Sequence, residues 1–269
     1  MRQRVFTALV MAVVMIPILI IGNTYQLFNL LCLAMLVLAG VEFRNMLKKK
    51  HALPFWIDVL VVLLTVLVGA SIYLDLSQIS SSLFLIIVLG SMLSLFIVWV
   101  FIPQFNSADF GGAILGILYI SIGFASIALL RDMGIFVLVY LLLVTMLTDT
   151  FAYLFGIKFG KHRLAVNISP KKSIEGAIAG LIFGGILSTV FAYFLNVFDF
   201  HILYVLLLSF GLSVLSQIGD LVASKFKREA GIKDFSNLLP GHGGIMDRFD
   251  SLLFSSAYLI LLFLVIELI

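Results

Sequence analysis

Charged side chains are scarce in this chain: Asp, Glu, Lys and Arg together make up 12% of its 269 residues, whereas 62% are hydrophobic. A water-soluble domain keeps about a quarter of its residues charged so that its surface is hydrated. No stretch of the sequence is polar enough to form such a domain, and the mean hydropathy is +1.22. The composition excludes a soluble globular fold and indicates a membrane-embedded protein whose solvent is largely lipid.

Cysteine is almost absent, and the single Cys32 lies inside an apolar run. One cysteine excludes an intrachain disulfide bond and any metal site built from clustered cysteines. The Gly-x4-Gly-Lys-Ser/Thr pattern is also missing. Its absence excludes a P-loop nucleotide site.

The chain has instead a series of about nine apolar segments, each long enough to cross roughly 30 Å of hydrocarbon as a helix. They are continuously apolar and lack the alternation of a membrane strand. The first begins like a signal peptide but has no convincing cleavage site, so we expect it to be retained. The predicted fold is an all-α polytopic membrane protein. Its expected spans are residues 5–21, 25–47, 55–74, 81–102, 111–130, 135–155, 176–197, 202–223 and 249–269.

The distribution of positive charge predicts the orientation. If the N-terminus is cytoplasmic, 16 of the 17 Lys and Arg residues fall on the cytoplasmic side, and only Arg131 lies outside. This skew follows the positive-inside rule, and an odd number of spans places the C-terminus outside. The basic face suits anionic lipid head groups or anionic soluble substrates. Nucleic acid is not an expected partner, because the charges lie in short loops between helices.

Two predicted cytoplasmic loops, residues 156–175 and 224–248, contain most of the unusual polar residues. We therefore expect residues 1–134 to form five N-terminal spans. Residues 135–269 are expected to form four spans that carry the chemistry together with these loops. The two parts would make one integrated membrane domain.

Four aspartates lie beside these loops. Asp149, Asp220 and Asp250 fall within or at the ends of apolar segments, where a carboxylate costs several kcal/mol unless it pairs with a cation or lines a wet cavity. Asp247 lies three residues before Asp250, so the two would share one face of a helix. Carboxylate oxygens together with phosphates suit Mg²⁺. The alternative is that these aspartates only form ion pairs with nearby lysines and arginines.

Cations and glycines in the loops point to phosphate chemistry. Positioned cations neutralise charge on a transferring phosphoryl group, although a solvated basic loop is the alternative, especially for Lys225. The stretch 240–245 is rich in glycine and can approach a ligand closely, and its His242 could donate to a phosphate. Gly176, Gly180 and Gly184 recur every fourth residue and predict close helix packing, within the subunit or in a homodimer. The candidate cations are Lys171, Lys172, Lys227, Arg228, Lys233 and Arg248.

These loops resemble the phosphatidate cytidylyltransferase family. The family signature runs Ser, two residues, Lys-Arg, four residues, Lys-Asp, a spacer, Pro-x-His-Gly-Gly, two residues and Asp-Arg-x-Asp. Its fixed positions are Ser224, Lys227, Arg228, Lys233, Asp234, Pro240, His242, Gly243, Gly244, Asp247, Arg248 and Asp250. A preceding block also agrees at Asp149, Ala152, Tyr153, Gly156, Gly160, residues 169–172, Glu175 and Gly176. Two positions depart from it, Ser173 and Ile174, where threonine and an aromatic residue are usual.

The resemblance covers residues 145–250 and implies that CTP and phosphatidic acid react to give CDP-diacylglycerol and pyrophosphate, with Mg²⁺ required. On this basis we expect a site on the cytoplasmic side of the cell membrane, next to membrane lipids. Expected metal ligands are Asp220, Asp247 and Asp250, a second cation being left open. Expected catalytic residues are Asp220, Asp247, Lys227 and Arg248. Expected substrate contacts are Asp149, Lys171, Lys172, Ser224, Lys227, Arg228, Lys233, Asp234, His242, Gly243, Gly244 and Arg248.

Two other functions are compatible with some of these features. A CTP-dependent lipid kinase acting on a polyprenol-type alcohol would use similar cations and carboxylates but transfer the γ-phosphate. An ion-coupled transporter would use Asp149 and Asp220 as ion ligands, but the sequence shows no internal repeat, and its polar residues gather at one membrane face. The CDP-alcohol phosphotransferases are disfavoured, since their Asp-x2-Asp-Gly-x2-Ala-Arg pattern is absent.

Overall fold

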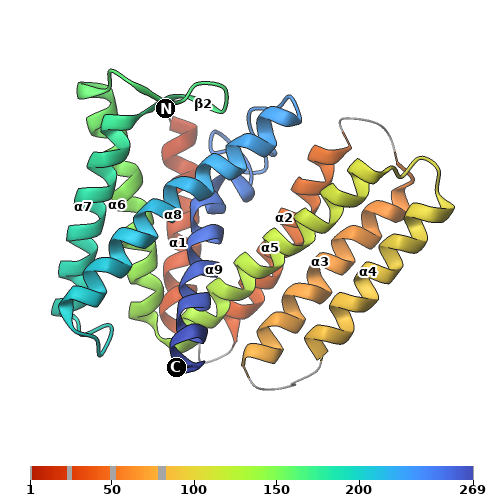
Figure 1. Cartoon of the computed structure of the whole chain (residues 1–269), viewed down its shortest axis with the longest axis horizontal. Helices are drawn as coiled ribbons and strands as arrows, with labels where there is room; N and C mark the ends of the chain where they lie inside the picture. The colour runs from red at the N-terminus through yellow and green to blue at the C-terminus, as the bar shows by residue number, and fades with distance from the viewer. Residues whose placement is uncertain (1, 23–25, 49–52, 78–82, 269) are drawn as a thin grey trace. The chain divides into compact units, whose positions relative to one another are not determined.

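The structure, a computed structural model, describes residues 2–22, 26–48, 53–77 and 83–268 (Figure 1). Within these ranges the chain forms nine α-helices and one two-stranded sheet. The helices are α1 (Arg2–Ile21), α2 (Leu27–Leu47), α3 (Phe55–Leu76), α4 (Leu83–Phe101), α5 (Ser107–Met133), α6 (Ile135–Phe159), α7 (Ile174–Phe194), α8 (Ile202–Glu229) and α9 (Met246–Leu268). The strands are β1 (Arg163–Ala165) and β2 (Ser169–Ser173).

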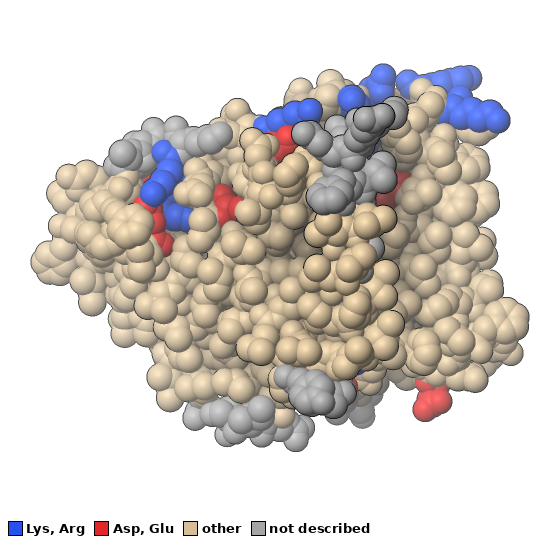
Figure 2. All heavy atoms as spheres, turned by 180° about the vertical axis from the view of Figure 1, so that it is seen from behind, with Lys and Arg blue, Asp and Glu red and all other residues tan. Residues whose placement is uncertain are grey.

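Eight of the helices in the described ranges, α2 to α9, are long and apolar enough to cross a membrane, and α1 adds a shorter apolar helix, Leu9–Ile21. Large apolar side chains on them are exposed, among them Val100 at 68% and Phe101 at 74%. Figure 2 shows broad areas of helix surface without charged side chains. Such a surface suits lipid better than water. The predicted all-α polytopic membrane fold is confirmed, whereas the orientation of the termini stays a prediction.

The chain folds as two compact units. Unit 1 comprises Met1–Leu129 together with Glu229–Arg248, and unit 2 comprises Leu130–Arg228 together with Phe249–Ile269. Most of the second predicted loop therefore belongs to the same unit as α1 to α4. The functional division proposed at residues 134 and 135 stays a prediction.

In unit 1, helices α2, α3 and α5 pack closely at glycines (Figure 1). A Cβ atom at Gly69 of α3 would overlap Leu36 of α2, and one at Gly116 of α5 would overlap Phe43 of α2. The Ser121 hydroxyl donates to the carbonyl of Thr65 at 2.7 Å and ties α5 to α3. These contacts give the N-terminal helices an apolar core of their own.

In unit 2, helix α7 lies directly against α6. A Cβ at Gly180 would meet the carbonyl oxygen of Thr148 at 2.6 Å, and one at Gly184 would lie 3.0 Å from the backbone N and Cα of the same residue. A Cβ at Gly176 would overlap the carbonyl oxygen of Ala152 and lie 3.0 Å from Gly156 Cα. The predicted packing role of the three glycines is confirmed within the subunit. A homodimer stays a prediction.

The first predicted loop contains a β-hairpin that the sequence analysis did not predict. Strands β1 and β2 are antiparallel, with Arg163 opposite Ser173 and Ala165 opposite Ser169. The hairpin leads directly into α7, where the hydroxyl of Ser173 accepts a hydrogen bond from Gly176 N at 3.2 Å and caps the helix. Neither short strand alternates apolar and polar residues as a half-buried strand does, so the usual strand signal is missing.

A substitution at the α6–α7 contact tests this packing. Gly184→Ala places a methyl group against the Thr148 backbone, and overpacking of this kind costs about 1–3 kcal/mol. We expect a lower thermal midpoint in detergent micelles, even though alanine favours a helix over glycine by about 1 kcal/mol.

Gly90→Ala on α4 is the matched control, because no described atom lies within 4 Å of its added Cβ. Its midpoint should stay the same or rise. Equal midpoints for the two variants would contradict the packing described for α6 and α7.

Candidate functional site

Unit 2 contains a cavity of about 650 Å³ beside the β-hairpin. Helices α6, α7 and α8 and the hairpin supply its walls. Tyr153 and Ile157 form an apolar side, and each is 68% exposed. The polar lining residues are Asp149, Arg163, Lys171, Lys172, Ser173, Gln217 and Asp220. The cavity therefore presents two carboxylates and three cations next to apolar surface.

Asp220 is the best connected of these residues. Lys172 Nζ forms an ion pair with Asp220 Oδ2, and Ser224 Oγ donates to Asp220 Oδ1 at 3.3 Å. Since Lys172 lies on β2 and Asp220 on α8, the ion pair joins the hairpin to the helix. A carboxylate placed among apolar helices needs such partners.

Two further carboxylates lie within electrostatic range of Asp220. Asp149 of α6 interacts with Asp220 and Lys172, and Asp250 of α9 interacts with Asp220, Lys227 and Asp149. The three carboxylates repel one another, and Lys172 and Lys227 offset part of this repulsion.

The end of α8 fixes the hairpin. Arg228 Nε donates to the carbonyl oxygen of Ile168, at the hairpin turn, over 3.2 Å. At the other end of the hairpin, the Glu175 carboxylate accepts from the backbone N of Lys161 at 3.1 Å and of His162 at 3.2 Å. The strand that carries Lys171 and Lys172 is therefore held on both sides.

The glycine-rich part of the second predicted loop lies in unit 1. We call residues 235–247 the glycine loop. Asp247 Oδ2 accepts from the backbone N of Phe235 at 2.8 Å and of Gly244 at 2.9 Å, and Asp247 is only 7% exposed. Leu239 N donates to the carbonyl of Gly243 at 2.8 Å. The Asp247 carboxylate thus closes the loop on itself.

Gly243 and Gly244 make room for two carboxylates. Gly243 has a φ of +83°, and a Cβ there would lie 2.7 Å from Asp247 Oδ2. A Cβ at Gly244 would overlap the carboxylate of Glu42, which lies on α2. Both glycines therefore have a role inside the protein, while the predicted contact with substrate stays a prediction.

The predicted site residues divide between the two units. In unit 2 the structure brings Asp149, Lys171, Lys172 and Asp220 to one cavity, with Ser224, Lys227 and Asp250 joined to this group by the contacts above. In unit 1, Lys233, Asp234 and Arg248 are exposed and Asp247 is buried. The individual roles of all these residues stay predictions. The unit 1 group is Lys233, Asp234, His242, Gly243, Gly244, Asp247 and Arg248.

The donor atoms in unit 2 fit a magnesium ion that shares its ligands with substrate. In the described part of the chain, no three His, Cys, Asp or Glu residues are grouped so as to hold a metal by themselves. Mg²⁺ commonly takes only one or two carboxylates and completes its shell with water and phosphate oxygens. Asp220 suits this role, since its carboxylate already binds the cationic Lys172.

Three residues of these arrangements were not predicted from the sequence: Arg163 and Gln217 in the cavity lining, and Glu42 against the glycine loop. Glu42 had a usable signal, because it is a carboxylate inside an apolar segment. Arg163 and Gln217 had none, since a basic loop residue and a single amide on a helix are common.

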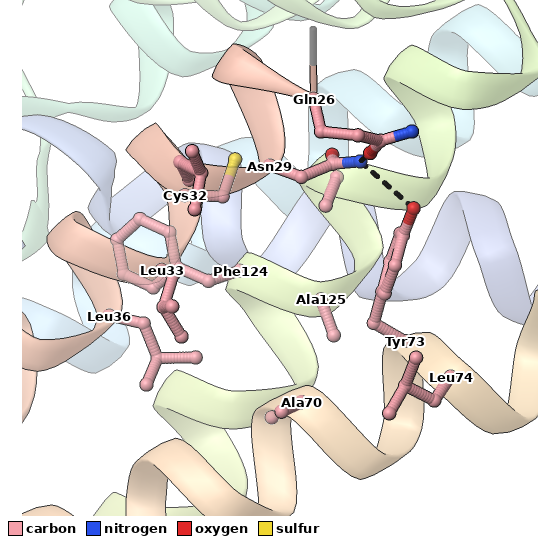
Figure 3. Close-up of a pocket in the computed structure, with 13 residues that line it drawn as sticks. Gln26, Asn29, Cys32, Leu33, Leu36, Ala70, Tyr73, Leu74, Phe124 and Ala125 are labelled. Atoms are coloured by element: carbon pink, nitrogen blue, oxygen red, sulfur yellow. Dashed lines mark hydrogen bonds between the residues drawn. The ribbon is translucent and has the colours of Figure 1, made fainter. Parts of the chain in front are cut away.

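A second cavity, of about 220 Å³, lies in unit 1 between α2, α3 and α5 (Figure 3). Asn29 Nδ2 donates there to the Tyr73 hydroxyl at 2.9 Å and also to Gln26 Oε1. No Asp, Glu, Lys or Arg is among the described residues that line it. It therefore lacks the charged groups that phosphate chemistry needs, and the cavity of unit 2 is the candidate site.

Comparison with known proteins agrees with this chemistry. The sequence model of the cytidylyltransferase family matches residues 2–266. A phosphatidate cytidylyltransferase of Staphylococcus haemolyticus (strain JCSC1435) is 35% identical over 254 residues, which are 94% of this chain and 95% of that protein. The protein of the same name from Staphylococcus aureus (strain COL) is 36% identical over 256 residues, with the same coverage of both chains.

The anchoring of the hairpin can be tested at Arg228. Arg228→Ala removes the hydrogen bond to Ile168, and we expect faster amide hydrogen exchange across residues 163–173, because local opening becomes easier. Lys225→Ala, on the exposed side of the same helix, serves as the control and should leave this exchange unchanged. The same exchange rate in both variants would show that Arg228 does not hold the hairpin.

Proposed function

The chain belongs to the cytidylyltransferase family, and from that premise we propose that it is a phosphatidate cytidylyltransferase. It would transfer the cytidylyl group of CTP to phosphatidic acid and release pyrophosphate. One observation carries the proposal beyond the family: the cavity of unit 2 combines carboxylates, cations and exposed apolar side chains. This combination suits a reaction that joins a charged nucleotide to a lipid.

Both substrates are polyanions, and the cations of the cavity suit them. Arg163, Lys171 and Lys172 are three positive groups in one lining, and such groups bind phosphate and offset charge during its transfer. Tyr153 and Ile157 offer apolar contact to a lipid on the same side. Lys171 and Lys172 are therefore proposed to hold the lipid phosphate.

The reaction needs no covalent intermediate with the protein. An oxygen of the phosphatidate phosphate attacks the α-phosphorus of CTP and forms a new P–O bond. The bond from the α-phosphorus to the oxygen that bridges it to the β-phosphate breaks, and pyrophosphate leaves with that electron pair. The protein has to align the two phosphates in line and offset their charge.

Asp220 is proposed as a ligand for Mg²⁺, which would supply positive charge between the two phosphates. Lys172, which pairs with Asp220, is proposed to contact a phosphate oxygen. Asp247 and Asp250 as further ligands, and a second cation, remain predictions from the sequence pattern. Lys227, Arg228, Lys233 and Arg248 are proposed to offset charge on the triphosphate and the leaving pyrophosphate.

The proposed location is the cytoplasmic side of the cell membrane, where the nucleotide is available. Membrane lipids surround the chain, and phosphatidic acid would reach the site from them. The basic residues of the loops support this side by the positive-inside rule.

Labelled CTP separates this function from that of a lipid kinase. Purified protein is incubated with phosphatidic acid, Mg²⁺ and CTP labelled either at the α- or at the γ-phosphorus. We expect the α-label to enter the lipid and the γ-label to appear in pyrophosphate. Transfer of the γ-label to a polyprenol-type alcohol, with no α-label in lipid, would replace the proposal by a CTP-dependent kinase.

The role of Asp220 is tested by a change of one atom. Asp220→Asn keeps the shape of the side chain but removes its charge, and we expect turnover to fall by about a hundredfold or more, because several kcal/mol of charge stabilisation are lost. The measurement is pyrophosphate release at saturating CTP, in protein that elutes as wild type in gel filtration.

Asp199→Asn is the matched control, since Asp199 is an exposed carboxylate of the same unit. It should retain wild-type turnover. An Asp220→Asn protein as active as this control would remove Asp220 from the mechanism.

A further inference from the structure

Glu42 is a buried carboxylate that receives three hydrogen bonds from the glycine loop. It lies near the C-terminal end of α2 and is 4% exposed. Its Oε1 accepts from Ser236 Oγ at 2.6 Å and from Ile245 N at 2.9 Å, and its Oε2 accepts from Met246 N at 2.9 Å. Both oxygens are therefore occupied by groups about two hundred residues away in the sequence.

The position of Glu42 explains why a charge is tolerated there. Ile245 N and Met246 N stand at the start of α9, where backbone N–H groups lack partners within the helix and the helix dipole favours an anion. A carboxylate from α2 thus takes the place that a capping side chain usually fills. The charge of Glu42 is stabilised by the loop, and the loop is held by the charge.

Two other contacts hold the same loop. Asp247 Oδ2 accepts from Phe235 N and Gly244 N, and the hydroxyl of Thr7 on α1 donates to the carbonyl of Pro240 at 3.0 Å. Asp247 fastens the loop to itself, whereas Glu42 and Thr7 fasten it to helices of unit 1. Glu42 accepts three hydrogen bonds from the loop.

The fastened loop carries residues that the sequence pattern predicts to contact the substrate or a metal ion. His242 lies at its turn, and within the described residues its buried Nδ1 has no hydrogen-bond partner. Asp247 stands at its end, and Gly243 and Gly244 lie between them. Groups that act on a substrate need one fixed position, because small misplacements lower the rate strongly.

We propose that Glu42 is a positioning residue for cytidylyl transfer: it holds the glycine loop in the conformation that presents His242 and Asp247. This inference rests on the proposed function for its chemical consequence, but not for its structural part. It gives the N-terminal helices a role in the reaction, since α2 provides the anchor of a loop far along the chain.

The chemistry of the contact requires a carboxylate of this length. In Glu42→Gln one oxygen becomes an NH₂ group that would face a backbone N–H, so two donors would oppose each other. Aspartate is one methylene shorter and would draw the carboxylate away from the loop. Gly244 has no Cβ, and only this leaves space for the carboxylate.

The test measures the loop and the reaction in the same protein. In a Cys32→Ala background, Leu238→Cys introduces one spin label on the loop, at a side chain that is 49% exposed. Electron paramagnetic resonance then reports label mobility for wild type and for Glu42→Gln. Asp58→Asn is the matched control, because Asp58 is also a buried carboxylate of unit 1, paired with Arg44 and Lys48 instead of the loop.

We expect Glu42→Gln to make the label more mobile and to lower turnover by about tenfold or more. Asp58→Asn should lower the thermal midpoint while the label spectrum stays as in wild type. Ser236→Ala, which removes one of the three hydrogen bonds, should change mobility and turnover in the same direction by less. If Glu42→Gln does not fold, the Ser236→Ala variant tests the proposal instead.

Three results would overturn the proposal: unchanged label mobility in both loop variants, unchanged turnover, or the same mobility change in Asp58→Asn. Failure of the proposed function would look different. In that case the wild-type protein would form no CDP-diacylglycerol, while Glu42→Gln would still loosen the loop.

Discussion

The cost of placing a carboxylate among apolar helices constrains this structure more than any other interaction. Each buried or half-buried acid must find donors or cations, since lipid offers none. Asp220 finds Lys172 and Ser224, and Glu42 finds three donors of the glycine loop. Because these partners come from distant segments, satisfying each charge also joins a loop to a helix. The polar groups needed for chemistry thus determine how the irregular segments are held.

The same constraint explains which parts of the fold the sequence could predict. Continuous apolar runs specify membrane helices directly, and the helices observed differ from the predicted spans mainly at their ends. The spacing of Gly176, Gly180 and Gly184 was enough to predict close packing, because a helix repeats its face every fourth residue. Both signals lie within short segments of the sequence, so they can be recognised without knowledge of distant contacts.

The parts that could not be predicted depend on contacts between distant residues. The hairpin of residues 163–173 is held by Arg228 and Glu175 and not by a strand pattern of its own. The role of Glu42 depends on its hydrogen bonds with the glycine loop, which is distant in the sequence. Its presence in an apolar run was the one local signal, and it resembled that of Asp149, which was recognised because it preceded a polar loop. A carboxylate inside an apolar segment is therefore a signal even where no polar loop follows it.

Asp220 and Glu42 are carboxylates in two different environments. Asp220 lies at a cavity wall, where a ligand that enters the cavity can approach its carboxylate. Glu42 is almost fully buried, and both its oxygens accept hydrogen bonds from the loop, so its charge is satisfied inside the protein. An enzyme that acts on two polyanions benefits from having both kinds of carboxylate. Its loops must be ordered before a metal ion or a phosphate binds. Glu42 supplies that order for the glycine loop, and it lies in a helix that carries no recognisable motif.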